Sequence, residues 1–281
     1  MTAISNLPTT RARLSYSNPG DPLLKKAVIA AIELTTGRRK LERLYNAVRD
    51  LQLPPFQLWG AALQKLDIRM DFDAAQLAKI PKQGPVVFIA NHPFGVVDGL
   101  ILGHLVSSVR ERFAILVNEV ICKEEQLDDF LLPIDFRETK EAMQTNLRSR
   151  QETMARLQRG EALAIFPAGG VATSPKVFGA AQDLEWKRFT AKVIQQTRAT
   201  VVPIYVHGQN SRLFQMASHI SMPLRLSLLL NEIRNKMGKT IRITIGDPIT
   251  YETLSAATDR QNMLAYLRKM TFALGDPTVS S

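Results

Sequence analysis

The sequence has little from which to build disulfides, metal clusters or membrane spans. Its 281 residues include one cysteine, Cys122, which excludes a disulfide within the chain and a cysteine-based metal cluster. That usage fits a reducing compartment. The best apolar run near the N-terminus, residues 27–34, is interrupted by Glu33 and is too short to cross a bilayer. The first twenty residues contain no apolar run, so we expect no signal peptide and a soluble or peripheral protein.

Aromatic and acidic residues are also scarce. Aromatics make up 7%, and 36 Lys and Arg residues against 26 Asp and Glu residues give a net charge of +10. A basic chain favours a polyanionic partner such as nucleic acid, an anionic membrane surface or an acidic carrier protein. Nucleic-acid binding would require a concentrated basic patch with interleaved aromatics. The basic residues here are spread along the chain, as Lys25 and Arg268 illustrate, so we expect no nucleic-acid partner.

What is present is ordinary globular material, with 45% hydrophobic and 22% charged residues. Three helical segments are expected in residues 1–80: one from Asp21 to Gly37, one around residues 41–48, and one over residues 56–66. Their faces pack on the rest of the protein or form a basic amphipathic platform on lipid headgroups, with Phe56 and Trp59 inserted, and both can hold for different faces. We expect residues 81–281 to form the catalytic α/β domain.

Strand-like apolar runs alternate with helical stretches from residue 85 onward. Strands are expected at residues 86–90, 113–117, 134–136, 162–166, 200–206 and 240–245, and helices at 97–109, 138–159, 184–198 and 257–272. Continuous apolar strands separated by helices are typical of parallel sheets covered on both faces. The pattern predicts an α/β fold with a mostly parallel central sheet flanked by helices and an N-terminal helical subdomain.

The residues that follow the first of these strands carry the clearest chemistry. The strand ends in the polar pair Asn91-His92, a turn with Pro93 and Gly95 follows, and Asp98 stands at the start of a helix. Ligand crevices of open α/β sheets lie at such strand ends. A carboxylate that holds one imidazole nitrogen would leave the other free as a general base. The alternative is that the histidine caps a turn and the aspartate caps the helix.

This stretch resembles motif I of the glycerolipid and lysophospholipid acyltransferases. Its Asn-His-Pro-Phe-Gly version, residues 91–95 with Phe94, is similar to that of a bacterial subgroup of the superfamily. The family places four residues between its histidine and aspartate, whereas His92 and Asp98 have five between them. We expect a loop at Gly95 to absorb the extra residue and keep both side chains within reach.

Three further stretches match the family in the family's order. Residues 132–137 resemble motif II, which implies that Arg137 contacts the acceptor, and residues 201–205 resemble motif IV. Residues 163–170 are similar to motif III, which normally reads Phe-Pro-Glu-Gly-Thr-Arg-Ser. Ala168 stands at the position of its glutamate and Val171 at that of its arginine. His207, just past motif IV, either lines the site or caps a loop.

The resemblance implies an O-acyltransferase that moves an acyl group from a thioester of acyl carrier protein or coenzyme A to a lyso-lipid hydroxyl. His92 would be the general base, Asp98 would stabilise the imidazolium, and backbone amides of motif III or of the motif I turn would hold the oxyanion. No metal and no cofactor are implied. The implied substrate-binding residues are Asn91, Phe94, Gly95, Arg137, Phe166, Pro167, Gly169, Gly170 and His207.

The altered motif III points to a lyso-aminolipid as acceptor, and 1-acylglycerol-3-phosphate (lysophosphatidic acid) is the alternative. A lipid hydrolase and a non-catalytic lipid-binding relative remain as other functions on the same scaffold. The basic composition and the lipid acceptor together predict a cytoplasmic protein, peripheral on the inner face of the cell membrane.

Overall fold

A seven-stranded sheet forms the centre of the protein. The computed structural model describes residue 23 and residues 37–119, 125–176, 179–220, 222–255 and 259–276. The sheet has the order β1-β7-β6-β2-β5-β3-β4. The five neighbouring strands β6, β2, β5, β3 and β4 are parallel to one another. Strand β7 is antiparallel to β6, and β1 is parallel to β7. The strands are β1 (Arg69–Asp71), β2 (Val86–Ala90), β3 (Phe113–Asn118), β4 (Leu131–Ile134), β5 (Ala162–Ile165), β6 (Thr200–Val206) and β7 (Thr240–Ile245).

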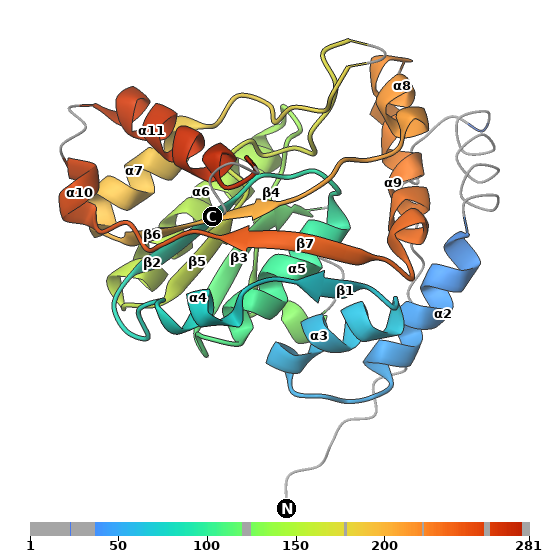
Figure 1. Cartoon of the computed structure of the whole chain (residues 1–281), viewed down its shortest axis with the longest axis horizontal. Helices are drawn as coiled ribbons and strands as arrows, with labels where there is room; N and C mark the ends of the chain where they lie inside the picture. The colour runs from blue at the N-terminus through green and yellow to red at the C-terminus, as the bar shows by residue number, and fades with distance from the viewer. Residues whose placement is uncertain are drawn as a thin grey trace, which may run out of the picture.

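Helices cover both faces of this sheet, which confirms the predicted α/β class (Figure 1). They are α2 (Arg38–Arg49), α3 (Pro55–Lys65), α4 (Ala74–Ala78), α5 (Val96–Ser107), α6 (Lys140–Gln158), α7 (Arg188–Thr197), α8 (Arg212–Ile220), α9 (Met222–Lys236), α10 (Tyr251–Ser255) and α11 (Arg260–Ala273). Successive side chains of β2 point to opposite faces. Phe88 joins the core formed with α3 and α5, and Val87 and Ile89 join the core formed with α7 and α11.

Several element ends differ from the sequence-based expectation for local reasons. The strand expected at residues 134–136 ends at Ile134, and the exposed Phe136 lies beyond it. The helix expected from residue 184 begins at Arg188, because the preceding residues are bonded elsewhere: Lys187 N–H donates to the carbonyl of Pro167. The last helix begins after Asp259, whose carboxylate accepts two backbone N–H groups at the helix start. Helices α4, α8, α9 and α10 and strand β1 were not predicted.

The chain before residue 80 is joined to the sheet as well as to its helices. Strand β1 pairs with β7, and α3 packs on α5. Trp59 is buried against Gly103 of α5, where an added Cβ would lie 2.4 Å from the indole. Of the two alternatives for this helix, packing on the rest of the protein holds for Trp59, whereas Phe56 is 47% exposed. The helix expected over residues 21–37 and Cys122 lie outside the described residues, and the domain division at residue 80 stays a prediction.

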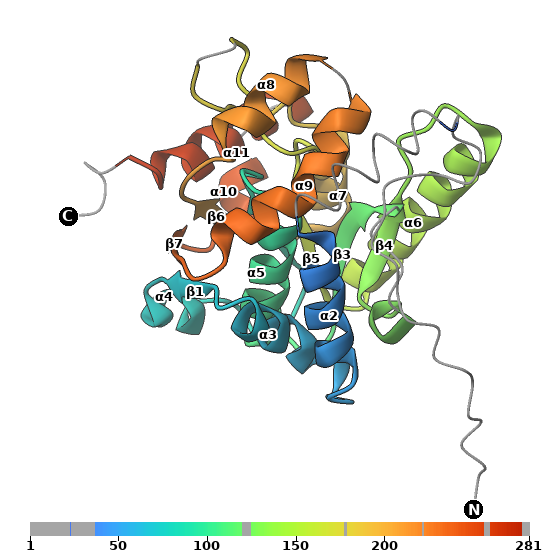
Figure 2. The ribbon, with the colours of Figure 1, turned by 90° about the vertical axis from the view of Figure 1, so that its right-hand side faces the viewer.

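Helices α8 and α9 stand beyond the carboxyl ends of the central strands (Figure 1). They pack on each other, and α9 also contacts α2 and α5 (Figure 2). A small apolar cluster joins them to the loop after β5 through Val171, Phe214 and Leu229. Among the described helices, none has both the length and the apolar character that a bilayer crossing requires.

Candidate active site

His92 and Asp98 form a hydrogen-bonded pair at the carboxyl end of β2. The His92 Nδ1 atom lies 2.9 Å from Asp98 Oδ2. The Asp98 side chain is fully buried, whereas the His92 side chain keeps 15% of its surface exposed. The predicted contact between the two side chains is confirmed, and solvent or substrate reaches the pair from the histidine side.

The turn between them is built around the same carboxylate oxygen. Asp98 Oδ2 accepts the backbone N–H groups of Phe94 at 2.8 Å and Gly95 at 2.9 Å. Gly95 has φ +88°, a conformation that residues with a Cβ rarely adopt and that lets the turn bring Asp98 back to His92. Because the Phe94 and Gly95 amides are bonded to Asp98, they are not free to hold an oxyanion.

Asn91 fixes the end of β2 to the neighbouring strand β6. Its Oδ1 accepts the backbone N–H of Val206 at 2.7 Å, and its Nδ2 donates to the Val206 carbonyl at 2.9 Å. The side chain is buried. Asn91 therefore holds the backbone on which His92 is mounted.

A second carboxylate, that of Asp183, accepts a hydrogen bond from the backbone of His92. Its Oδ1 accepts the backbone N–H of His92 at 3.1 Å, and its Oδ2 accepts the indole N–H of Trp186 at 3.1 Å. Burial raises the pKa of Asp183, and the hydrogen bond from His92 opposes that shift. Sequence reasoning missed this residue. The only signal was an acid three residues before a tryptophan at the start of an apparent helix.

Motif III packs directly on the histidine. The Phe166 ring stacks on the His92 imidazole with a centroid separation of 4.0 Å and an interplanar angle of 21°. The Ala172 N–H donates to the His92 carbonyl at 2.7 Å. The Gly169 N–H is used by the Phe166 carbonyl, whereas the Gly170 N–H has no partner within the described ranges. The Ala168 N–H also has no partner in the described part of the chain, but Ala168 is buried, so Gly170 is the more accessible motif III amide for an oxyanion.

The two altered positions of motif III lie in apolar surroundings. Ala168 is buried in the core beneath the loop, and the Val171 side chain joins the cluster with α8 and α9. The Val171 carbonyl, however, accepts Arg225 Nη2 at 2.7 Å. Arg225 comes from α9 and was missed because that helix was not predicted.

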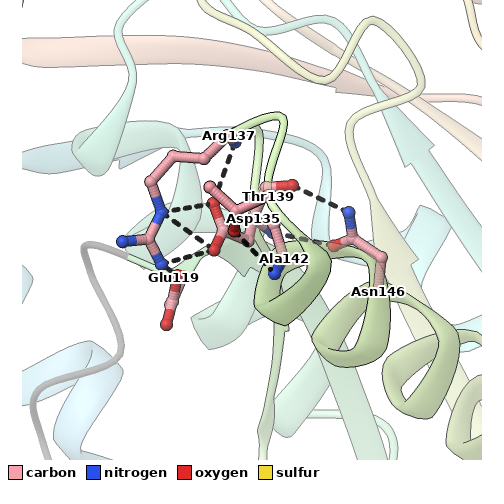
Figure 3. Close-up of polar contacts among 6 residues, drawn as sticks. All are labelled: Glu119, Asp135, Arg137, Thr139, Ala142 and Asn146. Atoms are coloured by element: carbon pink, nitrogen blue, oxygen red, sulfur yellow. Dashed lines mark hydrogen bonds and ion pairs between the residues drawn. The ribbon is translucent and has the colours of Figure 1, made fainter.

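Arg137 is held by two carboxylates (Figure 3). Its Nε lies 3.0 Å from both oxygens of Asp135, and its Nη2 lies 2.9 Å from Glu119 Oε2. The hydrogen bond from Arg137 holds the pKa of Asp135 well below its usual range. Figure 3 shows the remaining guanidinium nitrogen, Nη1, pointing away from both acids. The charge of Arg137 is thus largely compensated, although one nitrogen is open to a ligand.

The other predicted site residues lie around this centre. Phe94 is buried, and Lys236 Nζ lies 4.1 Å from its ring centroid. Pro167 accepts a backbone hydrogen bond through its carbonyl, as described for α7. His207 Nε2 is 2.8 Å from Thr244 Oγ1 on β7, and burial lowers its pKa. The contact with Thr244 anchors His207 to β7. That His207 lines the site stays a prediction.

Comparison with known proteins identifies the family of this chain. The model of the family described as acyltransferase matches residues 35–279. The chain belongs to this acyltransferase family. It is an enzyme of the transferase type and a member of the lysophospholipid acyltransferase superfamily.

The acyltransferase is similar to two curated proteins, both named lyso-glycine lipid O-acyltransferase. The one from Bacteroides thetaiotaomicron is 27% identical over 222 residues, with 76% of this chain and 78% of that protein covered. The one from Phocaeicola vulgatus is 27% identical over 225 residues, with 76% of each covered. The crystal structure of the 1-acyl-sn-glycerophosphate (LPA) acyltransferase PlsC from Thermotoga maritima shares the fold, with a TM-score of 0.51, 13% identity and coverage of 90% and 88%.

Replacing Asp183 should remove one of the contacts that fix the backbone of His92. Asp183→Ala leaves the His92 amide and the buried indole N–H of Trp186 without an acceptor. We expect the free energy of unfolding to fall by about 1–3 kcal/mol and the acyl-transfer rate to fall with it. Chemical denaturation followed by tryptophan fluorescence measures the first effect. Glu185→Ala, an exposed acid two residues away, is the control, and equal losses in both variants would contradict this role.

Proposed function

We propose that this acyltransferase moves an acyl group from a thioester to the hydroxyl of a lyso-lipid, with His92 as general base. The observation that carries the proposal is the 2.9 Å contact between His92 Nδ1 and the buried Asp98 carboxylate. An ionised carboxylate accepts the Nδ1 proton, which leaves Nε2 unprotonated. Two relatives named as lyso-lipid O-acyltransferases support the same reaction class.

The chemistry of the proposed step balances without a further reagent. His92 Nε2 takes the proton of the acceptor hydroxyl as its oxygen attacks the thioester carbonyl carbon. The carbon–oxygen bond forms, the carbonyl oxygen becomes an oxyanion, and Asp98 stabilises the imidazolium. When the intermediate collapses, the carbon–sulfur bond breaks and the thiolate takes the proton from His92. The products are the acylated lipid and a free thiol of acyl carrier protein or coenzyme A.

The Gly170 N–H is the donor proposed for the oxyanion. It lies in the loop whose Phe166 ring stacks on His92, and it has no acceptor in the described part of the chain. A backbone amide fixed in this way stabilises negative charge as it develops and needs no reorganisation at the moment of reaction.

We propose a lyso-aminolipid as the acceptor class. The phosphomonoester of lysophosphatidic acid carries nearly two negative charges, and enzymes hold such groups with several cationic donors. Here motif III supplies none, and Arg137 is already neutralised by Asp135 and Glu119. Arg212 and Lys176, the nearest candidates in sequence to replace a motif III cation, are both exposed.

We also propose that the basic face of α2 lies on anionic lipid at the inner face of the cell membrane. Arg39, Lys40 and Arg43 are exposed on this helix, whereas Leu41 faces the core. Under this proposal residues 1–80 form the docking segment and residues 81–281 the catalytic domain.

His92→Ala should reduce turnover of a thioester donor with a lyso-lipid acceptor by roughly 10²- to 10⁴-fold, because a general base is lost. Asp98→Asn keeps an oxygen that can accept the turn amides but removes the charge that stabilises the imidazolium, so it should also be slow. His219→Ala, an exposed histidine on α8, serves as the control. Retention of more than about a tenth of the wild-type rate by His92→Ala would be incompatible with general-base catalysis.

The acceptor proposal is tested by offering two acceptors side by side. With one thioester donor, we expect acylation of a lyso-aminolipid and little of lysophosphatidic acid, measured as labelled diacyl product. The hydrolase alternative predicts fatty acid release that needs no acceptor. Efficient acylation of lysophosphatidic acid alone would refute the acceptor class while leaving the acyltransfer chemistry intact.

Membrane docking is tested by charge reversal rather than by removing helices, because Leu58, Trp59 and Leu63 of α3 are core residues. A triple Arg39→Glu, Lys40→Glu, Arg43→Glu variant should bind anionic vesicles more weakly, at about 1 kcal/mol for each basic residue near the surface. Co-sedimentation at increasing salt measures this. Equal binding of wild type and variant, or equal binding to neutral vesicles, would show that these charges do not dock the protein.

A further inference from the structure

Arg225 is bonded to motif III and has no acidic partner among the residues that the structure describes. Its Nη2 donates to the Val171 carbonyl, and its guanidinium lies 5.7 Å from the centroid of the Phe214 ring. No carboxylate in the described parts of the chain pairs with it, in contrast to Arg137, Arg156 and Arg159. A guanidinium has five N–H donors. The contact with Val171 uses one, so most of its donors are open.

Arg225 is linked to the dyad through the backbone of motif III and through its own helix. Val171 precedes Ala172, whose N–H donates to the carbonyl of His92. Leu229, one helical turn after Arg225, and Val171 both reach within 3.2 Å of where a Cβ on Gly95 would stand. Arg225 thus bonds motif III directly, and the next turn of its helix packs on the motif I turn.

Burial makes an unpaired cation at this place costly. Arg225 is partly buried, and desolvation lowers the pKa of its guanidinium. The Phe214 ring near the guanidinium attracts a cation but carries no net charge, so it does not neutralise Arg225. A bound anion offsets that cost, so the position is suited to an anionic ligand that arrives with the substrate.

We infer that Arg225 binds the headgroup carboxylate of the acceptor and thereby selects an N-acylated amino-acid headgroup. The inference rests on the proposed lyso-lipid acyltransfer and names the group that is recognised. A planar fork matches a carboxylate in bidentate geometry. Arg225 belongs to α9 and bonds motif III at Val171, so a different element supplies a cation beside that loop.

The fork of Arg225 matches the planar carboxylate of an amino-acid headgroup. Lys236, the cation over the Phe94 ring, donates to the Gln209 carbonyl and offers a point charge rather than a fork. The aminolipid headgroup holds its carboxylate a few bonds from the acyl-chain hydroxyl. The carboxylate can therefore rest on Arg225 while the hydroxyl faces His92.

The test compares two acceptors that differ only in this charge: lyso-glycine lipid and its methyl ester. We expect the wild-type KM to be lower for the free acid by roughly ten- to a hundredfold, the range for a hydrogen bond to a charged group. Arg225→Gln should raise the KM for the free acid to that for the ester and leave the ester unchanged. Arg225→Lys, which keeps the charge but loses the fork, should fall between them.

Matched controls separate the possible failures. Arg212→Gln removes an exposed arginine from α8 and should leave the preference for the free acid intact. Thermal unfolding of Arg225→Gln shows whether the variant is folded. If it is not, the ratio of the ester KM to the free-acid KM in Arg225→Lys gives a second measure of carboxylate recognition. Equal KM increases for both acceptors, or an increase for the thioester donor instead, would overturn the assignment. Absence of transfer by the wild type to either acceptor would refute the proposed function itself.

Discussion

One carboxylate oxygen organises the active site. Asp98 Oδ2 forms a hydrogen bond with the imidazole of His92 and accepts hydrogen bonds from the backbone amides of Phe94 and Gly95. The same atom therefore closes the turn, starts helix α5 and orients the histidine. Because the carboxylate is fully buried, its interactions are not weakened by solvent, and the turn cannot relax without disturbing the imidazole. The remaining contacts of the site hold this unit in place: Asn91 ties it to β6, and Asp183 and Phe166 pack on the histidine.

The departures from the superfamily pattern are connected through the loop after β5. Ala168 and Val171 replace two charged groups with apolar side chains, which pack in the core and against α8 and α9. The carbonyl of Val171 then anchors Arg225, so positive charge returns to the same place from another element. Meanwhile Arg137 is neutralised by its two acids. A guanidinium that has no acidic partner among the described residues, set beside the apolar side chains of motif III, fits the planar carboxylate of a lipid headgroup.

The sequence was sufficient where local signals are strong. Five apolar residues followed by Asn-His marked both β2 and the dyad, and the glycine marked the turn that brings Asp98 back to His92. It was insufficient where a role depends on a distant element. Trp59 lies on an amphipathic helix that fits lipid or core equally well, and only its contact with Gly103 decides. Asp183 contacts motif I and Arg225 contacts motif III only in the folded structure. Neither contact corresponds to a regular residue spacing in the sequence.

The most direct test of the central claim is the protonation state of His92 in the resting enzyme. Nitrogen NMR of protein labelled in its four histidines, with the His92 signals assigned by their loss in His92→Ala, distinguishes the two ring nitrogens. The account predicts a neutral ring with the proton on Nδ1, directed at Asp98, and an unprotonated Nε2, with this preference weakened in Asp98→Asn. A neutral ring that carries its proton on Nε2 would contradict general-base catalysis by this dyad.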